Sequence, residues 1–295
     1  MRKTFIHYLV PTLLIILTGC SLPLFGAPTV TPTFFPAPTG TPTVPPTPTQ
    51  TVTPLPTSTP EPTQTPTWIY TAKGQVIVPI LLYHKVLDGG GPNDNCYCVS
   101  TSAFMEQMQW LYDHGYTTIP VSKVVDVILN GGELPARPVA ITFDDGMMDI
   151  YTTSYPIMRQ FGFTGTLFLV AGWSNGQGII PNTGIQEMIA NGWEIGDHSM
   201  THFDLSSDYS QLRYQMFDSK QVLQDTFGVP VDTIAYPFGV LNSSVVEKAI
   251  AYGYKAGLAL GRGYTQNSNK IFELTREEVR LSYDMSQFIA LLPWQ

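Results

Sequence analysis

The chain has 295 residues, of which 43% are hydrophobic and 13% are charged, and its formal net charge is −8. This acidic balance argues against nucleic acid as the main partner, because phosphate binding depends on clustered Lys and Arg side chains. The length allows one or two domains.

The first twenty residues predict export. A basic "MRK" precedes the apolar run "FIHYLVPTLLIILTG", as in a signal peptide. The segment ends in "LTGC", which resembles a bacterial lipobox and implies that Cys20 is lipidated and becomes the mature N-terminus. An uncleaved membrane anchor with an incidental cysteine is the alternative. Both interpretations predict that the rest of the chain is exported.

Residues 21–67 are predicted to form a linker. From Pro28 to Thr67 the chain is dominated by Thr and Pro, with Glu61 as its single charge. Such a segment cannot bury a core, and its prolines favour an extended polyproline II path. We therefore expect a disordered tether between a lipid anchor in the cell membrane and one domain, residues 68–295, in the cell envelope or outside the cell.

Cys96 and Cys98 lie two residues apart in "NCYC". Export permits a disulfide between them, although this spacing is near the geometric limit on an extended strand. Free thiols and a soft-metal site are the alternatives.

From Trp68 onward, apolar runs alternate with amphipathic helical patterns. Strands are predicted at residues 76–84, 138–145, 164–170, 193–198, 233–239, 255–260 and 277–282. Helices are predicted at residues 102–115, 121–132, 150–162, 183–192, 209–228, 243–253 and 286–292. Repeated βα units indicate an α/β domain with a parallel sheet, either a barrel or a doubly wound sheet. In both architectures the functional groups gather at the carboxyl ends of the strands.

Four polar clusters fall at predicted strand ends: His84, the Asp144–Asp145 pair, "DHSMTH" at residues 197–202 and "YPFG" at residues 236–239. Each has a plain alternative, because "DDG" is a common turn sequence and two histidines four residues apart occur by chance as a solvated pair.

Taken together, the clusters predict a metal site. His198 and His202 can face one point in space, and one carboxylate then completes a set of three ligands with open positions for water and substrate. Zinc is the default metal for such a set, and iron, cobalt and manganese are compatible with it.

These motifs resemble those of the polysaccharide deacetylases, carbohydrate esterase family 4, which share the NodB homology domain. "TFDDG" matches the first family motif, "HSMTH" the second and "YPFG" much of the third. "YHKV" and "LTREEV" resemble segments of the subgroup that acts on exported N-acetylglucosamine polymers. The resemblance covers residues 68–295 and implies a distorted (β/α)7 barrel.

The resemblance implies that Asp145, His198 and His202 bind the metal and that Asp144 is the general base. Two departures concern the assisting groups. The third motif usually begins with an arginine that braces the base, but Ala235 stands there, and no histidine follows His202 where the family places a catalytic one.

Other residues are candidates for the roles of the missing arginine and the missing histidine. His84 follows the first strand and is a candidate general acid or substrate ligand, or else has a structural role. His114 lies at a predicted helix C-terminus, where the helix dipole favours it, so a structural role is expected there. Arg276 is the candidate that the subgroup resemblance favours for bracing Asp144, and Arg280 is the second.

The implied function is that of a metal-dependent hydrolase of carbon–nitrogen bonds other than peptide bonds. It would remove N-acetyl groups from poly-N-acetylglucosamine, peptidoglycan or chitooligosaccharides. The segment Tyr236, Pro237, Phe238 and Gly239 would contact the substrate, with the Tyr236 N–H at the oxyanion, and Trp173 is either a sugar-stacking residue or loop packing. A glycan-binding protein that has lost catalysis and an O-acetyl xylan esterase are the alternatives, and no obligate protein partner is inferred.

Overall fold

The computed structural model describes residues 66–89 and 97–295. The predicted signal peptide, Cys20, Cys96 and the linker up to residue 65 lie outside this part of the chain. Within it, Cys98 is disulfide-bonded, and no helix has the length and apolar character needed to cross a membrane.

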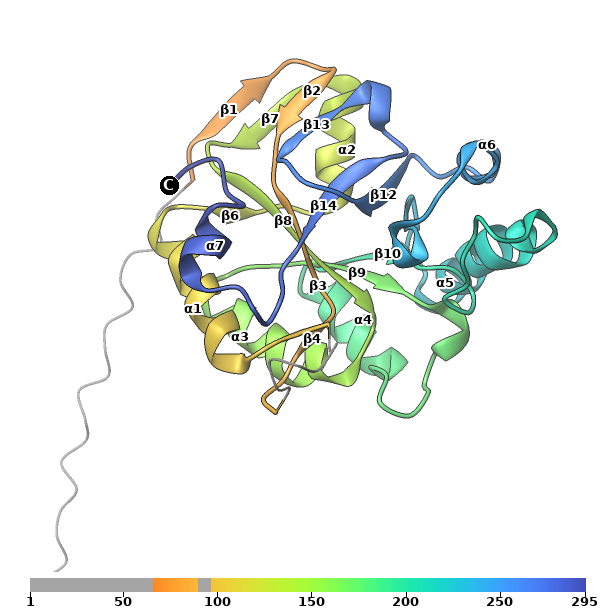
Figure 1. Cartoon of the computed structure of the whole chain (residues 1–295), viewed down its shortest axis with the longest axis horizontal. Helices are drawn as coiled ribbons and strands as arrows, with labels where there is room; N and C mark the ends of the chain where they lie inside the picture. Colours follow the sequence, from red (N-terminus) through yellow and green to blue (C-terminus); the bar gives the residue numbers. More distant parts are fainter. Residues whose placement is uncertain (1–65, 90–96) are drawn as a thin grey trace, which may run out of the picture. The chain divides into compact units, whose positions relative to one another are not determined.

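Seven parallel strands close into a barrel (Figure 1). In ring order they are β3 (Ile80–Tyr83), β14 (Leu274–Glu278), β12 (Ala256–Leu260), β11 (Thr233–Ala235), β10 (Glu194–Asp197), β9 (Thr166–Leu169) and β8 (Pro138–Asp145). The ring closes because β3 also pairs with β8, with Ile80 opposite Ala140 and Tyr83 opposite Phe143. The predicted distorted (β/α)7 barrel is confirmed, and the open doubly wound sheet is excluded.

The barrel strands are nearly continuous runs of buried residues. In β8, "PVAITFDD", every residue is buried except the last, as expected for a parallel strand that is covered on both faces. The chain therefore becomes polar at Asp144 and Asp145, at the carboxyl end of the strand.

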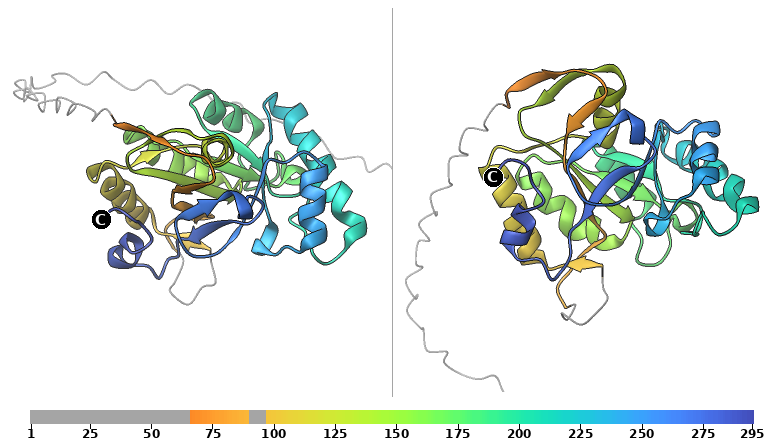
Figure 2. Two further views of the ribbon diagram at one scale, coloured as in Figure 1. Left: turned by 90° about the horizontal axis from the view of Figure 1, so that it is seen from above. Right: turned by 45° about the horizontal axis from the view of Figure 1, so that its top comes forward.

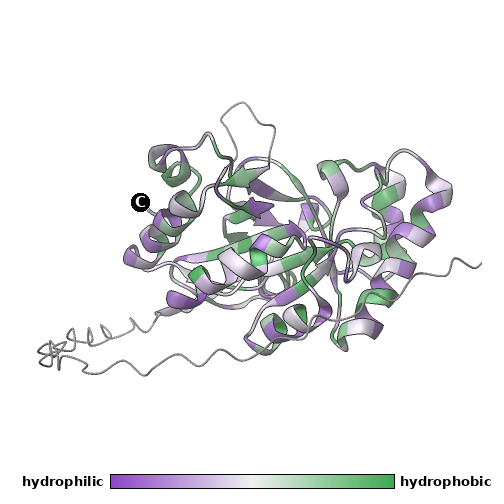
Figure 3. Cartoon of the chain, turned by 90° about the horizontal axis from the view of Figure 1, so that it is seen from below, coloured by the Kyte–Doolittle hydropathy of each residue, from purple (hydrophilic) through white to green (hydrophobic). Residues whose placement is uncertain are grey.

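Seven α-helices cover the barrel, and Figure 3 shows hydrophobic and hydrophilic residues alternating along them. They are α1 (Thr101–Asp113), α2 (Val121–Asn130), α3 (Tyr155–Gln160), α4 (Asn182–Ala190), α5 (Ser219–Phe227), α6 (Ser243–Ala251) and α7 (Met285–Ile289). Local capping sets the starts of several, since the side chains of Ser100 and Asn242 accept N–H bonds at the first turns of α1 and α6.

Short strands and helical turns lie outside the ring of seven strands (Figure 2). Two antiparallel ribbons pair β1 (Trp68–Thr71) with β7 (Gly132–Pro135) and β2 (Gln75–Ile77) with β13 (Thr265–Asn267). Two parallel additions pair β4 (Lys85–Val86) with β5 (Cys98–Val99) and β6 (Thr117–Thr118) with β8. Single turns of 3-10 or π helix are η1 (Ile150–Ser154), η2 (Ala171–Trp173), η3 (Tyr209–Gln211), η4 (Arg213–Asp218), η5 (Pro237–Gly239) and η6 (Ser268–Lys270).

Several predicted elements have wrong boundaries. The strand predicted at residues 233–239 ends at Ala235 and is followed by η5, and the helix predicted at residues 150–162 begins as the π turn η1. The strand at residues 76–84 is split into β2 and β3 around Pro79, which has no N–H for a ladder. The helix at residues 209–228 is divided into η3, η4 and α5. The last strand lies at Leu274–Glu278, upstream of the predicted residues 277–282, so Arg276 belongs to a barrel strand.

Phe143 anchors an aromatic core directly before the paired aspartates. It is fully buried, and its ring lies 5.6 Å from the rings of both Tyr83 and Trp193. Phe143→Ala should lower the free energy of unfolding by about 3–5 kcal/mol, because it removes a large ring from a packed interior. Urea unfolding followed by circular dichroism measures this, with the exposed Tyr214→Ala as a control expected to shift stability by less than about 0.5 kcal/mol. Equal losses in the two variants would contradict this assignment of the core.

Candidate active site

The carboxyl ends of the barrel strands surround a cavity of about 180 Å³. Its lining brings together nine of the residues that the sequence singled out, among them every member of the 236–239 segment except Pro237: His84, Asp144, Asp145, His198, His202, Tyr236, Phe238, Gly239 and Arg276. They come from five parts of the ring, namely β3, β8, β10, β11 and β14, so the closure of the barrel gathers them.

A buried ion pair forms the floor of this cavity. Arg276 donates from its two terminal nitrogens to the two carboxylate oxygens of Asp144, at 2.6 and 2.8 Å. Both residues are buried, with 1% and 2% of their surface exposed. The predicted contact between Arg276 and Asp144 is therefore confirmed, and Arg280 instead pairs with Glu278 at the surface.

The ion pair fixes the charge of Asp144. Burial alone would raise the pKa of this carboxyl, but the positive charge of Arg276 and the neighbouring His198 outweigh it and hold the pKa at about 2. Asp144 is thus ionised across the physiological range, and its two oxygens are oriented by the planar guanidinium.

Asp145, His198 and His202 form a compact set of possible metal ligands. One ligand atom from each lies within 4.8 Å of the others. The Oδ1 atom of Asp145 is 3.7 Å from Nε2 of His198 and 3.5 Å from Nε2 of His202. This oxygen is buried and has no hydrogen-bond partner among the described residues. An unpartnered carboxylate oxygen that faces two imidazole nitrogens fits a divalent cation.

The carbonyl of Ala235 sets the tautomer of His198. Its oxygen lies 2.7 Å from Nδ1 of the imidazole, and because a carbonyl only accepts, Nδ1 must donate. The lone pair of the neutral ring is then on Nε2, the atom that faces Asp145. Metal-binding histidines are commonly oriented by such a hydrogen bond behind the ring.

The charges of the set favour a cation as well. Burial first, and then the negative charge of Asp144, raise the pKa of Asp145 to about 7. Burial lowers the pKa of His198 to about 4 and also lowers that of His202, so both rings are neutral near pH 7. A bound cation would offset the repulsion between the two aspartates and compete with the proton on Asp145.

Asp197, which directly precedes His198, ties the loop that carries the two histidines to the surrounding structure through its side-chain hydrogen bonds. Its buried carboxyl group accepts hydrogen bonds from the hydroxyls of Ser219, at 2.5 Å, and Tyr254. Sequence reasoning treated Asp197 only as part of "DHSMTH" and missed its partners, because Ser219 and Tyr254 are distant in the chain and carry no motif.

Backbone strain is concentrated at this site. Of the five non-glycine residues with positive φ in the described chain, four lie in the site segments, namely Asp145, Ser199, His202 and Phe238. Left-handed conformations are costly for such residues and persist where the surroundings impose them, commonly at functional sites.

The segment at residues 236–239 requires a correction. The Tyr236 N–H donates to the carbonyl of Leu258 at 3.0 Å, continuing the ladder between β11 and β12, so it is not free to bind an oxyanion. The Gly239 N–H donates to the carbonyl of Tyr236, and Pro237 has no N–H. Within this segment only the Phe238 N–H has no acceptor in the described part of the chain.

The rim of the cavity is largely aromatic. The ring of His202 is stacked with Trp173 at 5.8 Å and meets the edge of Phe238 at 4.6 Å. Phe238 is 59% exposed, so one of its ring faces is open to solvent at the rim, whereas Trp173 packs against the ring of His202.

The two other histidines of the domain are separated as the sequence predicted. His84 lines the cavity beside Tyr97, with ring centres 5.1 Å apart, and burial lowers its pKa although Asp144 opposes this. His114 stacks on Trp110 at 3.8 Å, and its Nδ1 lies 2.8 Å from the carbonyl of that residue. His114 therefore has a structural role at the end of α1.

Known proteins resemble this chain in sequence and in fold. The family model for polysaccharide deacetylases matches residues 131–257. YxkH of Bacillus subtilis strain 168, whose name places it among the polysaccharide deacetylases, is 30% identical over 221 residues, covering 74% of this chain and 76% of its own. The chain therefore belongs to the polysaccharide deacetylase family.

One further relative and one solved structure are also similar to this chain. A poly-beta-1,6-N-acetyl-D-glucosamine N-deacetylase of Staphylococcus aureus strain MRSA252 is 28% identical over 195 residues, 60% of this chain and 66% of the relative. The structure of the Streptococcus pyogenes deacetylase PplD in complex with acetate superposes with a TM-score of 0.67 at 26% identity, covering 77% of this chain and 99% of PplD.

Cation affinity is expected to depend on pH through Asp145. A cation needs the ionised carboxylate, and a carboxyl with a pKa of about 7 binds a proton below that pH, so affinity should fall by about tenfold per pH unit below 7 and level off above it. Calorimetric titration of Zn²⁺ into metal-stripped protein between pH 5 and 8 measures this. The same affinity at every pH would contradict the raised pKa.

Proposed function

We propose that this protein is a metal-dependent deacetylase that removes N-acetyl groups from an N-acetylglucosamine-containing polysaccharide. One observation carries the proposal: an ionised Asp144, fixed by Arg276, adjoins three residues that fit a divalent cation. The similarity to a poly-beta-1,6-N-acetyl-D-glucosamine N-deacetylase supports this substrate class.

Asp145, His198 and His202 would hold the cation. A divalent ion at such a site polarises a carbonyl group and acidifies water, and zinc is the ion we expect for a ligand set of two imidazoles and one carboxylate. Asp144 is not a ligand in this scheme, since the compact ligand set consists of the three other side chains. Arg276 donates one hydrogen bond to each oxygen of Asp144, which leaves each oxygen able to accept another.

Asp144 orients the attacking water and accepts its proton. A carboxylate with a pKa of about 2 is always ready to accept a hydrogen bond but is a poor final site for a proton. The proton is therefore passed on as the C–N bond breaks. The water oxygen ends in acetate, and the nitrogen leaves as the free amine of a glucosamine unit.

His84 is the candidate relay to that nitrogen. It lines the same cavity, and because burial lowers its pKa its ring is neutral near pH 7. It would take up the proton that Asp144 accepts and deliver it to the departing nitrogen. The Phe238 N–H, which has no acceptor within the described chain, is the candidate donor to the developing oxyanion.

Acetate release tests the proposal directly. Asp144→Asn should lower acetate release from chitooligosaccharides or poly-N-acetylglucosamine by on the order of 10³-fold, because the amide cannot accept the proton. Metal content should be retained, since Asp144 is not a ligand, and chelation should abolish turnover of the wild-type protein. Metal-loaded wild-type protein that releases no acetate from any N-acetylated polymer would refute the proposal.

The same assay separates the alternatives. Glycan binding that is unaffected by Asp144→Asn, without acetate release by the wild type, would identify a binding protein that has lost catalysis. Acetate release from acetylated xylan but from no N-acetylated glycan would identify an O-acetyl esterase.

Replacing Arg276 by Lys tests how Asp144 is held. Lysine keeps the charge but cannot donate to both oxygens in a fixed plane, so the pKa of Asp144 should rise from about 2. At a Zn²⁺ concentration that keeps the site loaded at every pH tested, the acidic limb of the pH–rate profile should move to higher pH, and kcat/KM should fall by about 10²-fold. The matched control is Arg280→Lys, at an exposed pair with Glu278, which should leave the profile in place. An unshifted profile in Arg276→Lys would contradict the assigned role.

We further propose that the enzyme is exported and lipid-anchored through Cys20. The support is the signal-like first segment, the "LTGC" sequence and the Thr/Pro-rich segment before the domain. Labelling with a radioactive fatty acid, lost in Cys20→Ala, tests the anchor.

A further inference from the structure

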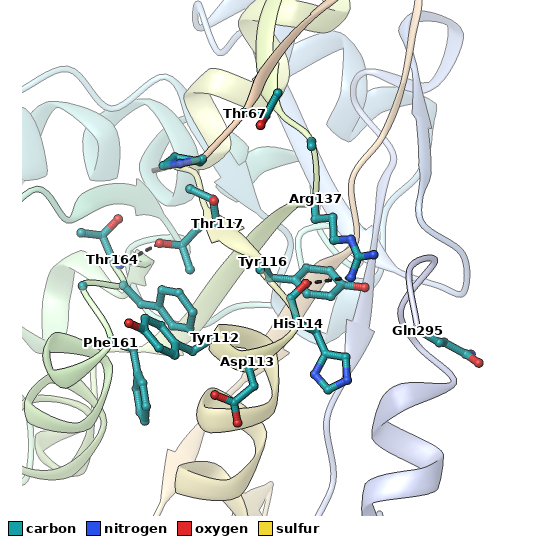
Figure 4. A pocket seen from close by; sticks show the side chains of 16 residues that line it. Thr67, Tyr112, Asp113, His114, Tyr116, Thr117, Arg137, Phe161, Thr164 and Gln295 are labelled. Carbon is teal, nitrogen blue, oxygen red and sulfur yellow. Dashed lines mark hydrogen bonds between the residues drawn. The ribbon is translucent and has the colours of Figure 1, made fainter. Parts of the chain in front are cut away.

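A second and larger cavity lies at the opposite end of the barrel (Figure 4). Its volume is about 790 Å³, within the range of pockets that bind organic ligands. The lining includes Thr117 and Thr118 of β6, Arg137 immediately before β8, and Thr164 shortly before β9. These positions lie at the amino ends of the strands, whereas Asp144 lies at a carboxyl end, seven residues along β8 from its start and about 23 Å away.

The walls of this cavity combine aromatic rings with polar groups. Tyr112 and Phe161 lie together on one side, with ring centres 5.6 Å apart, and Arg137 and Gln295 lie on the other. Arg137 donates one hydrogen bond, from Nη1 to the carbonyl of His114 at 2.8 Å, and pairs with no carboxylate in the described chain. Most of its planar donors are therefore available to a ligand.

Exposed aromatic residues continue from the cavity along β1. Thr67 lines the cavity, and Trp68 and Tyr70 follow it with 49% and 71% of their surface exposed. Residues two apart on a strand share one face, about 6.6 Å from each other. Ile69, between them, is exposed to a similar extent, 51%, so both faces of this two-stranded ribbon are open to solvent and the rings of Trp68 and Tyr70 are accessible to a ligand.

We propose that these residues form a second glycan-binding site, which we name the basal track: Trp68, Tyr70, Tyr112, Phe161 and Arg137. Its ligand is a stretch of the same N-acetylglucosamine polymer whose acetyl groups are removed at the other end of the barrel. This identification of the polymer rests on the proposed function. The track holds the polymer and carries no chemistry.

The chemistry of the track favours a neutral polyhydroxylated chain. Flat rings stack on the apolar faces of sugars, and the planar guanidinium and amide groups bind hydroxyl and acetamide oxygens. An anionic membrane surface is disfavoured by the net charge of −8. A purely apolar ligand is disfavoured by the threonine, arginine and glutamine side chains in the cavity.

Binding and turnover can be measured separately. In an Asp144→Asn background, affinity electrophoresis of the full chain through gels containing poly-β-1,6-N-acetylglucosamine reports binding without hydrolysis. Trp68→Ala with Tyr70→Ala should weaken binding by about tenfold, corresponding to the loss of ring stacking. Arg137→Gln should weaken binding to a lesser but measurable extent.

The matched control is Tyr214→Ala, since Tyr214 is 47% exposed, like Trp68, but lies on η4, away from the track. It should bind the polymer like the parent. With Asp144 restored, the track variants should release acetate from a tetrasaccharide at the parental rate but show a raised KM for the long polymer.

The binding measurements test the basal track without depending on whether the protein releases acetate. Unchanged polymer affinity in both the double variant and Arg137→Gln, or equal losses in Tyr214→Ala, would overturn the inference. Absence of acetate release from the tetrasaccharide by the wild type would instead refute the proposed function and leave the binding result interpretable. If the double variant fails to fold, as judged by its thermal melt, Arg137→Gln alone decides.

Discussion

A guanidinium and a carboxylate, both buried inside the barrel, hold each other ionised at the floor of the catalytic cavity. Removing one partner of such a pair would leave an uncompensated charge in the interior, at a cost of about 3–5 kcal/mol. Arg276 lies on β14 and Asp144 on β8, and β3 stands between these strands in the closed ring. The pair therefore forms only when the ring is closed in the correct register, so the charge state of the site is a property of the whole fold.

The positions of the main site residues could be predicted because a residue that follows a strand in the sequence lies at the carboxyl end of that strand in the barrel. Asp144, Asp145, His198 and His84 follow apolar runs, and the carboxyl ends of parallel strands share one face. The contact of Arg276 with Asp144 could also be predicted, but only through the family resemblance. The family places a bracing arginine where Ala235 stands here, and the subgroup resemblance of "LTREEV" favoured Arg276 in its place. The structure adds that the Ala235 backbone has its own use, since its carbonyl orients His198.

Other features depended on contacts that leave no local pattern. The hydroxyls that satisfy Asp197 come from Ser219 and Tyr254, far along the chain. The oxyanion role of the Tyr236 N–H was implied by the family resemblance alone, and it is wrong because this N–H donates to the carbonyl of Leu258 in the β11–β12 ladder. The division of residues 209–228 into η3, η4 and α5 likewise overrides a continuous helical pattern.

The described domain begins at the end of the barrel opposite the site cavity. The Thr67 carbonyl accepts the N–H of Ala136, just before β8, while the catalytic aspartates stand at the far end of that strand. The first described residues of the domain therefore lie at the amino ends of the strands, at the pole opposite the cavity that holds Asp144. A polymer bound at the basal track would have to pass around the barrel for its acetyl groups to reach that cavity.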